Sequence, residues 1–204
     1  MRPLADTLRP NKLEDVVGQK HLIGEGQILY NLVKHGKIFS MILYGPCGTG
    51  KTTLAYTIIN ELDLKYEFLN AVINSKKDLD EVISKAKANG GIVLIMDEIH
   101  RLNKDKQDLL LPYLENGLIT LIGLTTANPY HSINPAIRSR CQLFEVKMLN
   151  DDDIKEALNK AVKYLDKIDI SDEAISYIAR LSGGDLRYAY NLLEVVYYAS
   201  DNFK

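Results

Sequence analysis

A glycine-rich segment of the sequence has the composition and spacing of a phosphate-binding loop. Residues 45–52 read G-P-C-G-T-G-K-T, which fits G-x-x-x-x-G-K-[ST], and they lie between an apolar run and a helical pattern. Glycines let backbone N–H groups curl around phosphate oxygens, and the positive end of the following helix favours the same anion. In this pattern Lys51 reaches the β- and γ-phosphates, and the Thr52 hydroxyl binds Mg²⁺. The residues predicted to bind a nucleotide here are Gly45, Pro46, Cys47, Gly48, Thr49, Gly50, Lys51, Thr52 and Thr53.

Two adjacent carboxylates are predicted to end a buried strand. Residues 92–98 read I-V-L-I-M-D-E. The carboxyl end of such a strand faces the crevice where open α/β sheets bind ligands. There Asp97 can hold the magnesium ion, directly or through water, and Glu98 can polarise an attacking water. The alternative is a pair of solvated acids that cap the next helix, but the preceding phosphate-loop pattern favours the catalytic interpretation.

Further polar residues follow at the ends of later predicted elements. Asn128 ends the next strand and could orient a water beside the γ-phosphate, although Asn-Pro-Tyr is also an ordinary turn sequence. Arg138 and Arg140 precede the last strand. An arginine in such a loop is either solvated or neutralises charge on a transferring phosphoryl group. Arg187 lies near the start of a late helix that could fold over the nucleotide.

The elements that must position these residues alternate between strand and helix up to residue 146. This alternation indicates a parallel sheet flanked by helices, whose strands are covered on both faces and therefore read as continuously apolar. Residues 1–146 are thus predicted to form an α/β nucleotide-binding core. The predicted strands are 41–44, 66–70, 92–96, 119–125 and 142–146, and the predicted helices include 53–62 and 79–88.

After residue 146 the pattern becomes purely helical. Asn150 followed by three aspartates puts a capping side chain and negative charge where a helix begins. A second helix is expected after Ser171, ending at residues 183–184, and a third from near Asp185. Residues 147–204 are therefore predicted to form a small all-helical lid.

The composition is that of an ordinary globular protein. The chain has 204 residues, of which 46% are hydrophobic and 25% charged, and this usage excludes a disordered or fibrous protein. The net charge of −2 gives no sign of nucleic-acid binding. No apolar run reaches the ~18 residues of a membrane span, and the first residues do not resemble a signal peptide. We therefore expect a soluble cytoplasmic protein without a membrane partner. No chemistry is assigned to Cys47, Cys141, His21, His35, His100 or His131.

Together these residues resemble the AAA+ ATPases, and within them the clamp-loader-like group. The sequence is most similar to the replication-associated recombination protein A family, which includes the MgsA and Werner-helicase-interacting proteins. The resemblance runs through residues 8–10 (L-R-P) and 15–19 (D-V-V-G-Q). It is most specific at residues 97–101 (D-E-I-H-R) with Asn103-Lys104. A generic clamp-loader subunit would share the phosphate loop and Ser139-Arg140-Cys141 but lack that continuation.

The resemblance implies a P-loop AAA+ module with a five-stranded parallel sheet and a helical lid. It implies that residues around Val16, Val17 and Gly18 lie by the adenine. Asn128 matches the sensor 1 residue, Arg140 the arginine finger and Arg187 sensor 2, while Lys51, Thr52, Asp97 and Glu98 keep the roles given above. Position 138 need not be basic in the family. Asn70, at the end of the second predicted strand, is a candidate to restrain Glu98.

The function implied by the resemblance is that of a DNA-dependent, Mg²⁺-dependent ATPase in replication-fork maintenance and recombination. The expected partners are DNA forks, gaps and single-stranded/double-stranded junctions, together with single-strand-binding or replisome proteins. Family members are about twice as long and assemble through a C-terminal domain. The chain is therefore expected to be a fragment or truncated homologue of a cytoplasmic, nucleoid-associated homo-oligomer.

Two other functions remain as alternatives. A sliding-clamp-loader ATPase subunit would need partner subunits and a clamp. A P-loop kinase for a small metabolite is disfavoured by the adjacent Asp97 and Glu98, by Arg140 and by the distal helical lid, since kinases usually close a lid over an acceptor site.

Overall fold

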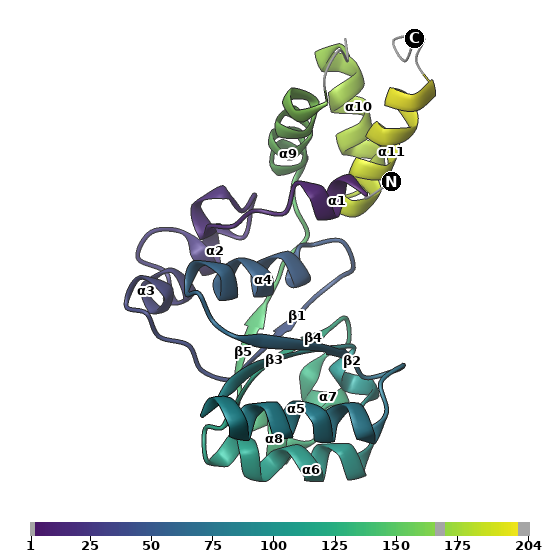
Figure 1. The fold of residues 1–204 in the computed structure, drawn as a ribbon. Helices are drawn as coiled ribbons and strands as arrows, with labels where there is room; N and C mark the ends of the chain where they lie inside the picture. The colour runs from purple at the N-terminus through teal and green to yellow at the C-terminus, as the bar shows by residue number, and fades with distance from the viewer. Residues whose placement is uncertain (1–2, 166–169, 200–204) are drawn as a thin grey trace.

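The computed structural model describes residues 3–165 and 170–199, and a five-stranded sheet lies at its centre (Figure 1). The strands pair in the order β2-β3-β4-β1-β5, and every pair is parallel. All five predicted strands are confirmed, although β3 extends one residue further and β5 ends one residue earlier than expected. The strands are β1 (Met41–Tyr44), β2 (Tyr66–Asn70), β3 (Ile92–Asp97), β4 (Ile119–Thr125) and β5 (Gln142–Glu145).

Burial on both faces explains the continuously apolar central strands. Residues 92–96 of β3 are all buried, and its last residue, Asp97, is half-buried. The edge strand β2 differs, because Tyr66 and Phe68 remain 41% and 39% exposed. Since parallel strands share one carboxyl edge, the loops after β1, β3 and β4 emerge side by side.

One face of the sheet is covered by the helices that precede and follow β1 (Figure 1). Leu54 and Ile58 of α4 pack with Leu43 of β1 and Leu124 of β4 in a single buried cluster. This packing fixes the start of α4 directly beyond the end of β1. The elements on this face are η1 (Leu13–Asp15), α2 (Lys20–Ile23), α3 (Ile28–Lys34) and α4 (Lys51–Glu61).

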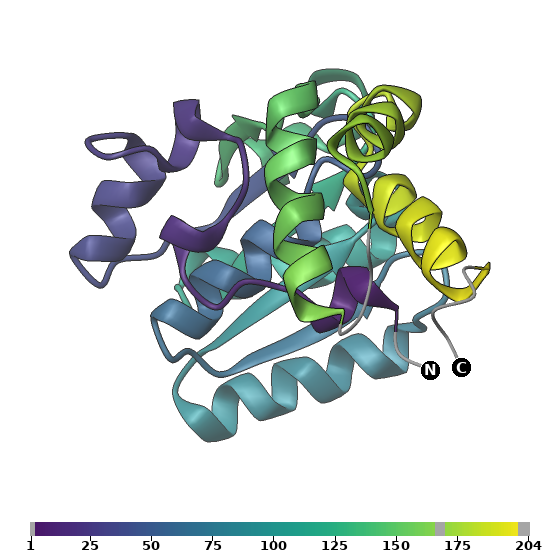
Figure 2. The same cartoon turned by 90° about the horizontal axis from the view of Figure 1, so that it is seen from above.

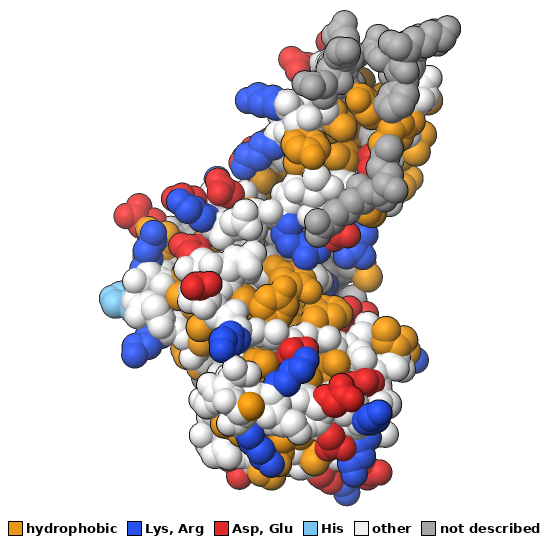
Figure 3. All heavy atoms as spheres, viewed as in Figure 1, with side chains coloured by type: hydrophobic (Ala, Val, Ile, Leu, Met, Phe, Trp, Pro, Cys, Tyr) orange, Lys and Arg blue, Asp and Glu red, His pale blue; other side chains and the backbone are white. Residues whose placement is uncertain are grey.

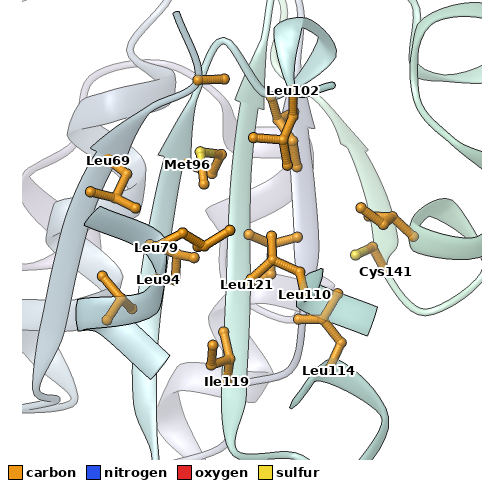
Figure 4. Packing of buried hydrophobic residues seen from close by; sticks show 14 of the residues in the cluster. Leu69, Leu79, Leu94, Met96, Leu102, Leu110, Leu114, Ile119, Leu121 and Cys141 are labelled. Carbon is orange, nitrogen blue, oxygen red and sulfur yellow. The ribbon is translucent and has the colours of Figure 1, made fainter. Parts of the chain in front are cut away.

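The opposite face is covered by helices from the middle of the chain. Leu79 of α5 and Leu110 of α6 pack on Leu94 of β3 and Leu121 of β4 (Figure 4). The same cluster holds Cys141, where burial raises the pKa of the thiol to about 12. These elements are α5 (Lys76–Asn89), η2 (Ile99–Arg101), α6 (Lys104–Glu115), α7 (Pro129–Ser132) and α8 (Pro135–Arg138).

The C-terminal helical unit, defined here as α9, α10 and α11, has a hydrophobic core of its own. Leu158, Ile178 and Leu193 contribute one residue from each helix, and Leu4 of α1 joins them. Seen from above, the unit lies over one side of the core, clear of α3 (Figure 2). Residues 166–169 and 200–204 of the predicted lid lie outside the described residues. The bounds are α1 (Leu4–Thr7), α9 (Asp151–Tyr164), α10 (Asp172–Ser182) and α11 (Leu186–Ala199).

Local capping sets the helix boundaries. Helix α4 begins two residues before the predicted start, directly after Gly50, whose φ is 95°. Helix α5 begins three residues early because Ser75 and Asp78 form a reciprocal capping box. The predicted cap at Asn150 is confirmed, since its side chain accepts the N–H of Asp153 at 2.8 Å. None of the described helices combines the length and apolar character needed to cross a membrane.

Candidate nucleotide-binding site

The loop between β1 and α4 has the backbone shape that its glycines predict. Gly48 and Gly50 have φ of 69° and 95°, in the left-handed region that favours glycine. Gly45 is needed for a different reason, since a Cβ there would lie 2.0 Å from the carbonyl oxygen of Val146. Thr49 closes the loop by donating its hydroxyl to the Pro46 carbonyl at 2.9 Å. The loop therefore ends at the positive end of the eleven-residue helix α4.

Lys51 folds back over this loop. Its Nζ donates to the carbonyl oxygens of Gly45 at 2.8 Å and Pro46 at 2.6 Å. Burial lowers the pKa of Lys51, while the nearby Cys47 and Glu98 act in the opposite direction. The ammonium is thus held against the backbone of the loop.

A cavity of about 150 Å³ lies where the phosphate loop, the carboxyl edge of the sheet and the helical unit meet. The chain segments around it are far apart in sequence but are brought together by the sheet and by α11. Its walls are formed by Ala5, Asp6, Arg9, Cys47, Gly48, Gly50, Lys51, Thr52, Thr53, Asp97, Glu98, Thr126, Leu186, Arg187 and Tyr190.

The two acids at the end of β3 are held in different ways. Asp97 Oδ1 accepts the N–H of Glu98 at 3.0 Å, and Asp97 Oδ2 accepts from Asn70 Nδ2 at 3.3 Å. Glu98 itself has φ of 51°, a backbone conformation that few non-glycine residues adopt. Its Oε2 lies 3.4 Å from Nδ1 of His100. The side chain of Asn70 therefore contacts Asp97, and the contact to Glu98 comes from His100.

The helical unit touches the phosphate loop directly at Gly48. The N–H of Leu186, the first residue of α11, donates to the Gly48 carbonyl at 3.0 Å. The carboxylate of Asp185 packs so closely that a Cβ on Gly48 would lie 1.9 Å from its Oδ1. Arg187 and Tyr190, near the start of α11, both lie at the cavity wall. Burial raises the pKa of Tyr190 to about 12.

Several predicted site residues lie outside the cavity wall. Gly45, Pro46 and Thr49 belong to the loop but do not line the cavity. Val17 packs against the core of the helical unit. Gly18 lies against Leu149, which precedes α9, and against Asp153 of α9.

Asn128 and the two arginines also lie elsewhere. The Asn128 side chain accepts the N–H of Tyr130 at 2.9 Å and caps α7. Arg140 forms an ion pair with Glu115 and donates to the Ala136 carbonyl. Arg138 instead donates to the Tyr130 carbonyl at 2.7 Å and stacks on its ring.

Six residues of the cavity wall received no role from the sequence; they are Ala5, Asp6, Arg9, Thr126, Leu186 and Tyr190. Arg9 lies in the L-R-P segment noted above, and it is held by Asp6 at 2.6 Å and over the ring of Tyr56 at 4.4 Å. That ring belongs to an aromatic cluster with Tyr66 and Phe68. Hydrophobic side chains gather on this face of the molecule over the core, below the helical unit (Figure 3).

Comparison with known proteins identifies the family. The AAA model, described as "ATPase family associated with various cellular activities", matches residues 41–149, more than half of the chain. The chain belongs to the AAA family of ATPases. The matched range contains the phosphate loop, both acids and Arg140, and the predicted AAA+ fold is confirmed.

Within the AAA family, the chain is similar to proteins of replication and recombination. It is 50% identical over 201 residues to replication-associated recombination protein A of Bacillus subtilis, covering 96% of this chain and 48% of that protein. It is 38% identical to the ATPase WRNIP1 of Dictyostelium discoideum, covering 95% of this chain and 23% of that protein. The predicted resemblance is thereby confirmed. The chain spans about half the length of the bacterial relatives that it matches.

The same arrangement occurs in a solved AAA+ motor. The structure of the Thermotoga maritima RuvB Holliday junction branch migration motor matches with a TM-score of 0.79 and 29% sequence identity. The match covers 92% of this chain and 64% of that chain, and so extends from the sheet into the helical unit.

Proposed function

We propose that the chain binds ATP in the cavity beside Gly48 and hydrolyses it with Mg²⁺. The observation that carries this proposal is the convergence of the phosphate loop, Asp97, Glu98 and Arg187 on one cavity. These groups are what phosphoryl transfer needs, because its catalysis consists mainly of positioning and charge stabilisation. Membership in an ATPase family supports the same reaction.

The residues at the cavity fit a magnesium ion. Thr52, the second residue of α4, and Asp97 both line the cavity, and both offer the oxygen ligands that Mg²⁺ prefers. Such ions are usually held by one or two protein oxygens together with the phosphates of the nucleotide. When bound, the ion would neutralise charge that develops on the phosphates.

The remaining roles follow from position. Lys51 would exchange its two loop carbonyls for the β- and γ-phosphates, and Glu98 would activate the attacking water. Thr126 lines the cavity beside these groups, whereas the Asn128 side chain caps α7. Asn128 remains the residue proposed to orient the attacking water. Arg187 would contact the nucleotide from α11. Val17 and Gly18 remain the proposed neighbours of the adenine.

Arg140 would act on the ATP of a neighbouring subunit. Its side chain pairs with Glu115 and does not line the cavity of its own chain. Arginine fingers supplied from another molecule raise phosphoryl-transfer rates by ~10³–10⁵. We therefore propose a homo-oligomer in which residues 1–146 form the ATP-binding core and residues 147–204 the lid. The oligomerisation domain that the resemblance implies would lie in the part of such proteins that this chain does not match.

The proposed cellular role is remodelling of DNA at replication forks and during recombination. The relatives named above support this role, and DNA forks, gaps and single-stranded/double-stranded junctions are the proposed partners. Single-strand-binding or replisome proteins at the same sites are the proposed protein partners. The proposed location is the cytoplasm, in association with the nucleoid.

The proposed function is tested by ATP hydrolysis over a wide range of protein concentration, with and without forked or gapped DNA. Glu98→Gln serves as the blank, because it should keep ATP binding and lose turnover. A specific activity that rises with protein concentration and with DNA is expected. A specific activity that is independent of protein concentration and of DNA would contradict the oligomeric and DNA-dependent parts of the proposal.

A further inference from the structure

His100 contacts two residues that follow different strands of the sheet. It belongs to η2, directly after β3, and its Nδ1 lies 3.4 Å from Glu98 Oε2 and 2.8 Å from Thr125 Oγ1. Thr125 is the last residue of β4, and only 1% of it is exposed. Its oxygen also accepts the N–H of Ala127 at 3.0 Å. One ring nitrogen therefore links the carboxylate after β3 to the segment after β4.

The chemistry of these groups restricts how the ring can be protonated. A carboxylate only accepts hydrogen bonds, so contact with Glu98 requires a proton on Nδ1. The Thr125 hydroxyl can either accept that proton or donate its own to a bare Nδ1. A ring with a proton on Nδ1 can donate to Glu98, whereas a ring with a bare Nδ1 can accept from Thr125. The ring cannot do both at once.

The position of Glu98 makes such a restraint useful. Its left-handed backbone directs the side chain from the end of β3, and 37% of that side chain is exposed. Lys51 and Glu98 line the wall of the same cavity. An unrestrained Glu98 carboxylate would be attracted to the ammonium group of Lys51, which must bind phosphate. Glu98 would then no longer be placed to activate the attacking water.

We propose that His100 is a positioning residue for the hydrolytic water. Its Nδ1–H holds the Glu98 carboxylate apart from Lys51, and Thr125 anchors the ring at the end of β4. Because Thr126 lines the cavity next to Thr125, the same contact ties the position of Glu98 to the wall of the nucleotide site. This inference rests on the proposed ATP hydrolysis.

A matched pair of substitutions tests the proposal. His100→Asn keeps a donor at the place of Nδ1, whereas His100→Leu has nearly the same size as asparagine and no donor. We expect His100→Leu to lower kcat by ~10–100-fold with the KM for ATP changed by less than about twofold, since a misplaced catalytic group costs rate rather than binding. His100→Asn should recover most of kcat, and His35→Leu, on the exposed end of α3, should leave it unchanged.

Three results would overturn the proposal. They are an unchanged kcat in His100→Leu, a raised kcat in that variant, or equal losses in the asparagine and leucine variants, which would indicate packing alone. Thr125→Val should lower kcat and Thr125→Ser should not, because only serine retains the hydroxyl that anchors the ring.

A second measurement does not depend on turnover. Nitrogen NMR of histidine-labelled protein distinguishes the two tautomers of each of the four histidines. We expect Nδ1 of His100 to be protonated and to lose that proton to Nε2 in Glu98→Ala, but not in Glu81→Ala. If His100 had the same tautomer in the wild type and in Glu98→Ala, the proposal would be overturned, even if the enzyme were active. Absent hydrolysis by the wild type would contradict the proposed function alone, and the NMR result would still decide the role of His100.

Discussion

The proposed catalytic machinery has two halves, which lie in different parts of the chain. The first half is the phosphate loop with the two acids after β3, and the second half is Arg140. The phosphate loop and the acids after β3 converge on one cavity within the chain. Arg140 lies after α8 and is paired with Glu115 of its own chain. The first half needs only the parallel sheet to assemble it, because all its segments follow strands at one edge. Arg140 does not line the cavity of its own chain, which is the arrangement expected of a group that serves a neighbour.

The largest effect is expected from Arg140→Ala. It should lower ATP turnover by ~10³-fold or more, because it removes the charge that stabilises the transferring phosphoryl group. Nucleotide binding should be unchanged, since the side chain lies away from the cavity of its own chain. Arg138→Ala is the matched control, and it should lower turnover by less than about tenfold because that side chain holds the carbonyl of Tyr130. Similar losses of turnover in the two variants would remove the distinction between these arginines.

Glu98→Gln should lower turnover by ~10²–10⁴-fold, the usual contribution of a general base. The variant should still bind ATP as tightly as the wild type, whereas Lys51→Ala should bind none detectably. Titration with a fluorescent ATP analogue checks the binding, and phosphate release checks the turnover. If both variants bound ATP equally well, the division of roles within the first half would fail.

Gly48→Ala should destabilise the contact between the phosphate loop and the helical unit. The added Cβ would collide with the Asp185 carboxylate, and we expect a loss of about 1–3 kcal/mol and a fall in Tm of roughly 3–10 °C. Gly36→Ala is the control, because Gly36 also has a positive φ of 64° but open space around it.

A second variant separates collision from backbone strain. Adding Asp185→Ala to Gly48→Ala should recover part of the lost Tm, since it removes the carboxylate. Calorimetry of the three variants measures these differences. Equal losses in Gly48→Ala and Gly36→Ala would show that strain alone is responsible.

The smallest effect is expected from Glu115→Gln, which frees Arg140. Exposed ion pairs contribute at most ~1 kcal/mol, so turnover below saturating protein concentration should rise by no more than about fivefold. At saturating concentration the two proteins should be equally active. A fall in turnover would mean that Glu115 orients Arg140 for its task.

Local patterns predicted the sheet well, and they placed the phosphate loop, Asp97 and Glu98 at the edge where one cavity lies. Gly48, Gly50 and Lys51 lie within the single segment 45–52, so the loop could be identified from the sequence alone. Asp97 and Glu98 could be placed because they end a buried strand, and the carboxyl ends of all strands in a parallel sheet lie at one edge. The start of α5 was less predictable, since a capping box at Ser75 extended the helix beyond its apolar pattern.

Contacts between distant segments could not be predicted in the same way. Arg9 reaches the cavity because Asp6 and Tyr56 hold it, and Tyr190 reaches it because α11 docks on Gly48. Neither contact leaves a periodic signal in the sequence. The loop after β4 shows how fine the distinction is, because Thr126 lines the cavity while Asn128, two residues on, caps a helix.

The central claim, that the two halves act on different copies of the chain, is tested most directly by mixing two inactive variants. Glu98→Gln retains a working Arg140, and Arg140→Ala retains a complete cavity. Each alone should be nearly inactive, and their mixture at high protein concentration should regain a substantial part of wild-type ATP hydrolysis. A mixture no more active than its components, at a concentration where the wild type hydrolyses ATP, would contradict the claim.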